Sequence, residues 1–224
     1  MTLDARAGLA LVIVTAVMCA LLFGTAGTLH YWQAWIYVSI FSGASTLTTV
    51  YLMKNDRALL ARRMRGGPTF EKEGTQRIIM VFTSLGFIAL LVGPALDHRF
   101  GWSAVPVWGV VLGDVFVVVG FYFIFLVYRE NAFTAAIIEV GAGQKVITTE
   151  PYAVVRHPMY ASGSLYMLGT PLALGSYWAF LALAGMLPFL FWRLLDDERI
   201  LTRDLPGYAE YRRRVRHRLV PCVW

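Results

Sequence analysis

The residues best able to do chemistry surround one proline, Pro158, which follows a polar stretch and precedes an apolar one. Proline suits the first turn of a helix, because its fixed φ fits and its missing N–H is not needed there. His157 then stands at the N-cap, and the backbone N–H groups of Met159 and Tyr160 have no partner inside the helix. Beside the positive end of the helix dipole they form a ready site for a carboxylate or phosphate, and Arg156 adds a cation.

Aromatic rings accompany this anion site. Tyr152 and Tyr160 offer ring faces, which attract cations such as a sulfonium group. The alternative interpretation is structural, because arginine, histidine and tyrosine are common where a helix enters a membrane. Composition alone favours that alternative, so a binding site here needs support from elsewhere in the chain.

A second polar cluster places three acids, Asp196, Asp197 and Glu198, in a row near the end of the last apolar stretch. Arg193 lies four residues before Asp197, so the two side chains share one face of a helix. Carboxylates in this position can accept hydrogen bonds from ribose hydroxyls or pair with an ammonium group. The alternative is a local ion-pair network of the acids with Arg193 and Arg199.

The elements that must position these residues are membrane helices. Of the 224 residues, 58% are hydrophobic and 15% are charged, whereas a soluble domain has about 45–50% apolar and about 25% charged residues. The apolar residues form long runs separated by short charged stretches, as expected of helices that satisfy their own backbone hydrogen bonds in lipid. The composition therefore predicts one membrane-embedded, all-α domain.

A crossing of the bilayer takes about 20 mainly apolar residues. Candidate segments span about residues 8–28, 31–53, 78–96, 105–128, 159–174 and 177–195. The first segment is long for a signal peptide, so we expect a retained helix. The last two meet at Gly175-Ser176 and form a helical hairpin, whose first arm is short for a full crossing. We therefore predict five to six transmembrane helices.

Positive charge orients these segments. Residues 54–77 carry seven Lys and Arg, the tail from Arg199 carries seven more, and the opposite side has only Arg99. The positive-inside rule predicts a cytoplasmic location for both termini and for the polar stretch 129–157. The host membrane is then the inner membrane of a bacterium or the endoplasmic reticulum of a eukaryote. The net charge of +6 follows from this bias, so we expect no nucleic-acid partner.

The basic tail has a helical pattern of its own. Tyr208, Tyr211, Val215 and Leu219 share one face at helical spacing. Asp204 is the expected N-cap of this helix. The pattern predicts a short amphipathic helix lying on anionic headgroups, and the alternative is a solvated basic tail.

Metal chemistry finds no support in the sequence. The two cysteines, Cys19 and Cys222, and the four scattered histidines lack the spacing of metal ligands. We therefore predict no metal site.

Together, the motifs resemble the isoprenylcysteine carboxyl methyltransferase family and its bacterial and archaeal relatives. The resemblance covers about residues 129–221. It rests on Arg156-His157-Pro158-Met159-Tyr160, Asp197-Glu198-x-x-Leu201, Pro206-Gly207-Tyr208-x-x-Tyr211 and Val220-Pro221. The combination at this spacing is far more specific than any one element.

The resemblance implies an integral membrane enzyme that uses S-adenosyl-L-methionine. The implied cofactor-binding residues are Gln144, Lys145, Val146, Ile147, Tyr152, His157, Pro158, Met159, Tyr160, Asp197 and Glu198. Arg193 is implied to face the substrate and position its carboxylate. Residues 1–128 then supply N-terminal helices, and residues 129–224 supply the cofactor- and substrate-binding half. Two positions differ from the family, which has glutamate in place of Asp197 and often histidine in place of Gln144.

The reaction so implied is methyl transfer to a lipophilic acceptor drawn from the membrane lipids or from a lipidated molecule. A prenylcysteine-like carboxylate suits the residues best, because it is already ionised and needs no general base. Phospholipid or small-thiol methylation is an alternative within the same architecture. A sterol-reductase-like enzyme that uses NADPH is a third hypothesis, and a non-catalytic membrane scaffold is a fourth. The sequence does not reveal the oligomeric state.

Overall fold

The computed structural model describes residues 1–71, 73–134 and 143–221, and Cys222 lies outside these ranges. The described residues form helices and contain no strand, as the sequence predicts. The elements are α1 (Leu3–Cys19), the π-turn η1 (Ala20–Gly24), α2 (Trp32–Asn55), α3 (Arg57–Arg63), the 3-10 turn η2 (Pro68–Phe70), α4 (Gly74–Phe100), α5 (Val107–Glu130), α6 (Pro158–Ala173), α7 (Ala179–Asp204) and α8 (Tyr208–Arg214).

Within the described residues, five helices are long and apolar enough to cross a membrane. They are α1 with η1, α2, α4, α5 and α7. Many large apolar side chains on these helices face outward, which is the expected surface of a protein solvated by lipid. The prediction of an all-α membrane protein is therefore confirmed.

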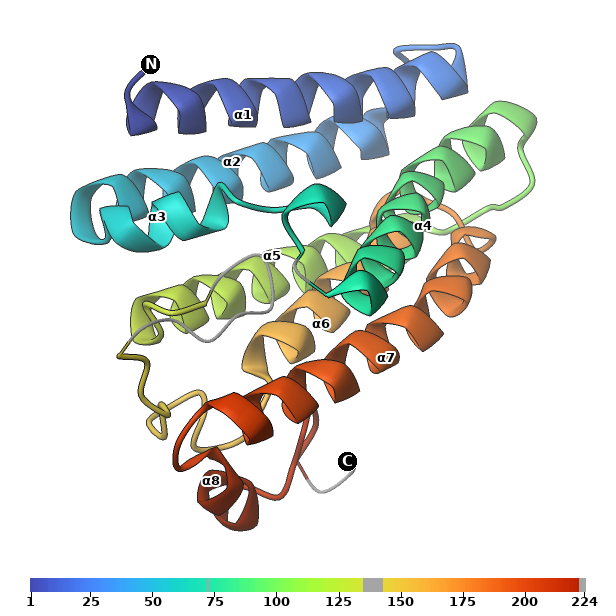
Figure 1. The fold of residues 1–224 in the computed structure, drawn as a ribbon. Coiled ribbons are helices and arrows are strands. Elements are labelled where there is room, and N and C mark those ends of the chain that lie inside the picture. The colour runs from blue at the N-terminus through green and yellow to red at the C-terminus, as the bar shows by residue number, and fades with distance from the viewer. Residues whose placement is uncertain (72, 135–142, 222–224) are drawn as a thin grey trace.

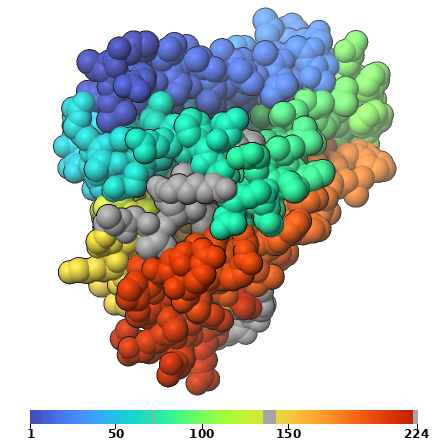
Figure 2. Space-filling model, in the orientation of Figure 1, coloured from blue at the N-terminus to red at the C-terminus, as the bar shows by residue number. Residues whose placement is uncertain are grey.

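The helices run back and forth between two ends of the molecule. Figure 1 shows the α1–α2, α4–α5 and α6–α7 connections at one end, and α3 and α8 at the other. We call the first end the latch end and the second the polar end. Figure 2 places the N-terminal helices and the C-terminal segment at opposite edges, with α4 between them.

α6 runs between both ends although it has only 16 residues. At its C-terminus, the hydroxyl of Tyr31 donates to the carbonyl of Leu174 at 2.6 Å. Asp97, at the end of α4 and 1% exposed, accepts hydrogen bonds from the hydroxyls of Ser103 and Ser176. These contacts tie the α6–α7 turn to α2 and α4, so the hairpin reaches the latch end.

Glycines bring α5 and α6 into backbone contact. A Cβ atom added at Gly113 would lie 2.2 Å from the backbone N of Ala173, and one at Gly120 would lie 2.8 Å from that of Tyr166. Small residues permit this close approach in membrane helix pairs. The pairing fixes the direction of α6 against α5 and so the position of its N-terminus.

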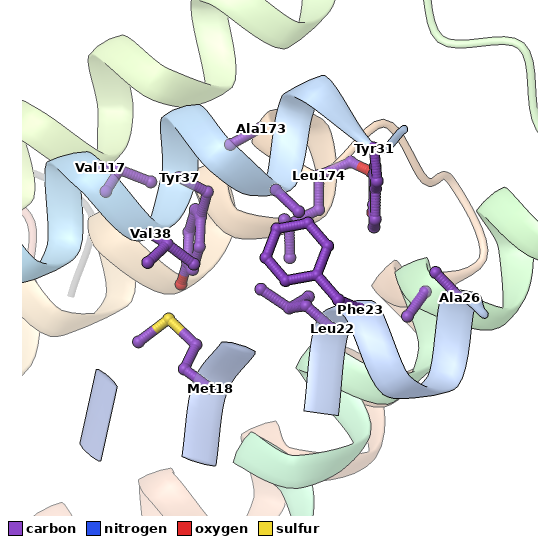
Figure 3. Packing of buried hydrophobic residues seen from close by; sticks show 12 residues of the cluster. Met18, Leu22, Phe23, Ala26, Tyr31, Tyr37, Val38, Val117, Ala173 and Leu174 are labelled. Carbon is purple, nitrogen blue, oxygen red and sulfur yellow. The ribbon is translucent and has the colours of Figure 1, made fainter. Parts of the chain in front are cut away.

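A buried apolar cluster joins the N-terminal helices to this pair. Figure 3 shows Met18, Leu22 and Phe23 of the first helix beside Tyr37 of α2, with Ala173 of α6 close by. The hydroxyl of Tyr37 bonds those of Tyr166 and Thr170 at 2.8 and 3.1 Å. The first segment is thus packed into the fold, as expected of a retained helix.

The prediction for the basic tail is wrong in three respects. Gly207 is the N-cap of α8, whereas Asp204 is the last residue of α7 and is bonded to Arg203. The helix ends at Arg214, before Val215 and Leu219. Its apolar face packs against the protein and not against headgroups: Tyr208 and Tyr211 are buried with Leu205. Amphipathicity identifies a face that needs burial, but it does not say which apolar surface provides it.

Replacing Gly113 by alanine is expected to destabilise the fold, because the added methyl group meets the backbone of α6. Overpacking costs about 1–3 kcal/mol, so the thermal midpoint in detergent should fall by several degrees. The matched control is Gly185→Ala on α7, where an added Cβ meets open space. Equal midpoints for the two variants would contradict the close packing.

Candidate functional site

A cavity of about 440 Å³ opens between α4, α6, α7 and the segments that flank them. Cavities that bind small molecules typically measure about 300–1,000 Å³. Among its lining residues are Gln144, Lys145, Val146, Ile147, Tyr152, His157, Pro158, Met159, Tyr160, Arg193 and Asp197. Of the residues predicted from the sequence, Glu198 is the one that does not line it. Segments far apart in the chain thus meet around one space, which we call the polar cavity.

The start of α6 has the predicted local structure. His157 is the N-cap and Pro158 is the first helical residue. The backbone N–H groups of Arg156 and His157 donate to the carbonyls of His217 and Arg218, at 2.9 and 3.0 Å. The C-terminal tail therefore holds the stretch that leads into α6.

The side chains of the three consecutive acids lie in three different environments, because neighbouring residues on a helix point about 100° apart. Asp196 pairs with Arg199 at 2.6 Å and accepts a hydrogen bond from the amide of Gln76. Asp197 lines the polar cavity. Glu198 turns away from the cavity and pairs with arginines. The expected ion pair with Arg199 is thus formed by Asp196, whereas Glu198 pairs with other arginines and Arg193 pairs with Glu71. The binding role of Asp197 stays a prediction.

Glu198 forms buried ion pairs with Arg156 and Arg218, and we call these three residues the ionic clamp. One carboxylate oxygen accepts from Nε of Arg156 at 2.7 Å, and the other accepts from Nε of Arg218 at 3.1 Å. Glu198 is 4% exposed. Arg156 also donates to the carbonyls of Val215 and Arg216. The clamp joins α7, the start of α6 and the tail at one point.

His157 lies between the ionic clamp and the cavity wall, because it is close to both Glu198 and Asp197. Its Nε2 lies 3.4 Å from Oε1 of Glu198, and its Nδ1 lies 3.9 Å from Oδ2 of Asp197. The ring of His157 also meets that of Tyr160 edge to face, with centroids 5.7 Å apart. A carboxylate, two rings and a helix N-terminus therefore surround one space. This combination suits a small molecule that carries both positive and negative groups.

Arg193 is already engaged by the protein. Its Nη2 donates to Glu71 at 2.8 Å, and its Nη1 donates to Gln76 at 3.1 Å. Glu71 and Gln76 are 2% and 0% exposed. The charge of Arg193 is thus compensated by a buried carboxylate, while the side chain still contributes to the cavity wall.

Tyrosines and an amide complete the wall on the tail side. Asn131 donates to the hydroxyl of Tyr152 at 2.7 Å, and Tyr211 donates to the carbonyl of Tyr152 at 2.7 Å. Burial raises the pKa of Tyr152, Tyr208 and Tyr211 above the usual tyrosine value. These phenols therefore remain protonated near neutral pH and do not act as bases.

Sequence reasoning missed several residues of this site. Glu71, Gln76 and Asn131 contact predicted residues directly. They lie outside the recognised motifs, and no periodic pattern sets them apart. The one signal in the sequence was Glu71, an acid within a stretch dominated by Lys and Arg.

Comparison with known families supports a methyltransferase. Residues 108–205 match the family model described as phospholipid methyltransferase. The match confirms the resemblance to the membrane methyltransferases, and it spans nearly all of α5 and the whole of α6 and α7. No curated protein matches the chain.

Glu198→Gln is expected to loosen the tail, because an amide cannot balance both arginines of the clamp. Breaking a buried ion pair costs about 3–5 kcal/mol. Trypsin should therefore cut after Arg213 and Arg214 several-fold faster in the variant, since cleavage follows local opening. The control is Glu210→Gln on the exposed face of α8. Identical cleavage rates in the two variants would show that the clamp does not hold the tail.

Proposed function

We propose that this chain transfers a methyl group from S-adenosyl-L-methionine to a lipophilic acceptor, because its residues 108–205 match the family model described as phospholipid methyltransferase. The observation that carries the proposal is the polar cavity, where Asp197 and Tyr160 face one space with the N-terminus of α6. A membrane methyltransferase needs a place for a charged cofactor beside the apolar helices, and this cavity provides it.

The residues of the cavity suit the charges of this cofactor. Asp197 and the ring of Tyr160 offer negative potential for its positive groups. The N-terminal N–H groups of α6 suit its carboxylate. Gln144, Lys145, Val146 and Ile147 supply polar and apolar wall for its nucleoside part. When bound, the cofactor supplies an electrophilic methyl group on a sulfonium sulfur.

Glu198 has a positioning role in this proposal. It does not line the cavity, but it holds Arg156 and contacts His157 from behind. By fixing His157, the clamp sets the orientation of the first turn of α6. Arg156 and the tail likewise exclude solvent from the wall at Tyr152 and Tyr211.

The acceptor that we propose first is a prenylcysteine-like carboxylate. A carboxylate oxygen is ionised at neutral pH, so the new C–O bond forms as the C–S bond breaks, with no proton to remove. Such a displacement depends chiefly on holding the nucleophile in line. Arg193 is the residue proposed to hold it. Arg193 lines the polar cavity, and its planar guanidinium suits a carboxylate.

A phospholipid amine is the second candidate, and two observations favour it. The matching family model is described as phospholipid methyltransferase, and Arg193 is already paired with a buried carboxylate. An amine must lose a proton before it attacks. The tyrosines on the tail side remain protonated, so they do not supply this base.

We further propose that the polar cavity faces the cytoplasm. Residues 54–77, which include α3, and the C-terminal segment from Arg199 on carry 14 of the 20 Lys and Arg residues of the chain. Positive residues are retained on the cytoplasmic side of a membrane.

The cofactor assignment is tested by isothermal titration of S-adenosylhomocysteine, the demethylated product, into the detergent-purified protein. We expect the dissociation constant to rise at least tenfold in His157→Ala and in Asp197→Asn. The first variant removes an imidazole ring from the cavity wall, and the second removes its negative charge. The controls His30→Ala and Asp204→Asn alter exposed residues away from the cavity and should bind as the wild type does. Binding of NADPH in place of this nucleotide would indicate a reductase, and binding of neither would favour a scaffold.

The acceptor is tested by transfer of a tritiated methyl group to N-acetyl-S-farnesylcysteine, to dioleoyl phosphatidylethanolamine or to a small thiol. For the farnesylated carboxylate, Arg193→Gln should raise KM or lower kcat at least tenfold and leave nucleotide binding nearly unchanged. If the variant methylates this carboxylate as fast as the wild type, Arg193 does not position it. Methylation of the phospholipid alone would favour the second candidate.

A further inference from the structure

A second cavity, of about 730 Å³, adjoins the polar cavity inside the membrane helices. We call it the membrane cavity. Its walls come from α1 to α6, and they include Leu11, Val14, Val17, Phe41, Phe121 and Ile124. Figure 3 shows Met18 and Tyr37, which line this cavity and belong to the buried apolar cluster. The lining suits a hydrocarbon chain.

The two cavities share part of their walls. Arg63, Phe87, Gly163 and Met167 line both. An added Cβ at Gly163 would meet nothing within 4 Å. The absent side chain therefore leaves open space in α6 where the cavities meet. A molecule longer than one cavity can pass this point.

Arg63 stands at this junction, at the end of α3. Its guanidinium carbon lies 5.0 Å from the centre of the Tyr128 ring, which also lines the membrane cavity. A guanidinium has five N–H donors in a planar fork that matches carboxylate and phosphate groups. The ring contact orients that fork, which can bind an anion in addition to its present partners.

We infer that the methyl acceptor is an amphiphile that occupies both cavities, with its hydrocarbon chain in the membrane cavity and its carboxylate or phosphate on Arg63. This inference rests on the proposed function and names the acceptor half of the same site. Arg63 meets the boundary between polar and apolar walls, which is where the headgroup of an amphiphile joins its chain. Arg193 lines the polar cavity and not the membrane cavity, so Arg63 is the arginine that both halves of such a molecule meet.

The two halves of the acceptor site then have different origins in the chain. α5 and α6 lie within the family match, whereas α1, α2 and α3 lie before it. Arg63 and most of the walls of the membrane cavity belong to this earlier part. The N-terminal helices therefore select the acceptor, while the matched segment carries the wall proposed for the cofactor.

The role of the positive charge of Arg63 is tested with the variant Arg63→Gln. The matched control is Arg65→Gln, because Arg65 is exposed and lines neither cavity. Binding of N-acetyl-S-farnesylcysteine and of dioleoyl phosphatidylethanolamine is measured without cofactor, and KM is measured where methylation occurs. We expect Arg63→Gln to weaken acceptor binding at least tenfold, with S-adenosylhomocysteine binding within twofold of wild type. Arg63→Lys should restore part of the loss, because it keeps the charge without the fork.

Binding of the hydrocarbon chain in the membrane cavity is tested with Gly163→Leu, whose side chain fills the junction of the two cavities. The control is Gly185→Leu, on the exposed face of α7. Gly163→Leu should lose at least tenfold in binding of the farnesylated acceptor and keep binding of its S-butyl analogue. Gly185→Leu should bind both as the wild type does.

The outcomes separate the two proposals. Acceptor binding that is unaffected by Arg63→Gln, or equal losses for long and short chains in Gly163→Leu, would overturn the inference. Absence of nucleotide binding and of methyl transfer in the wild type would instead overturn the proposed function. In that case, the measurements of acceptor binding without cofactor still show whether Arg63 and the membrane cavity bind an amphiphile. A preference for the carboxylate or for the phosphate identifies which anion Arg63 binds.

Discussion

The site depends on the burial of one carboxylate between two arginines. Glu198 accepts from Arg156 and Arg218 and contacts His157, so a single residue of α7 fixes the start of α6 and the returning tail. A buried charge is tolerated only when it is paired and hydrogen-bonded, and here the partners come from three separate segments. The wall of the polar cavity exists because this pairing brings those segments together. The backbone bonds from Arg156 and His157 to the tail reinforce the same arrangement.

A similar rule governs the other charges at this end of the molecule. Asp196 has Arg199 and Gln76, and Arg193 has Glu71 and Gln76. Most charged groups are thus neutralised within the protein, and Asp197 is left to face the cavity beside His157. A carboxylate among neutralised neighbours sets a local negative potential, which is what a sulfonium ligand would require. The tyrosines of the tail side add neutral hydrogen-bond donors and no competing charge.

Much of the cavity could be predicted from the sequence, because its main elements follow local rules. The place of His157 before Pro158 follows from helix capping, and the alignment of Arg193 with Asp197 follows from helical spacing. Glu71 and Gln76 could not be found in this way, since they meet α7 across more than a hundred residues of chain. The tail was misread for a related reason. Its apolar face was recognised, but its partner surface, formed with Leu205, exists only in the folded chain.

The shortness of α6 bears on how deep the polar cavity would lie in a bilayer. Sixteen residues rise about 24 Å, whereas the hydrocarbon core of a bilayer is about 30 Å thick. A helix of this length that starts at one edge of the hydrocarbon core therefore ends short of the other edge. Extracting a long-chain molecule from lipid costs about 0.8 kcal/mol for each methylene exposed to water. Under the proposed function, a cavity at the start of so short a helix would spare the acceptor that cost, because its chain would stay in the hydrocarbon core while its polar group met the cofactor.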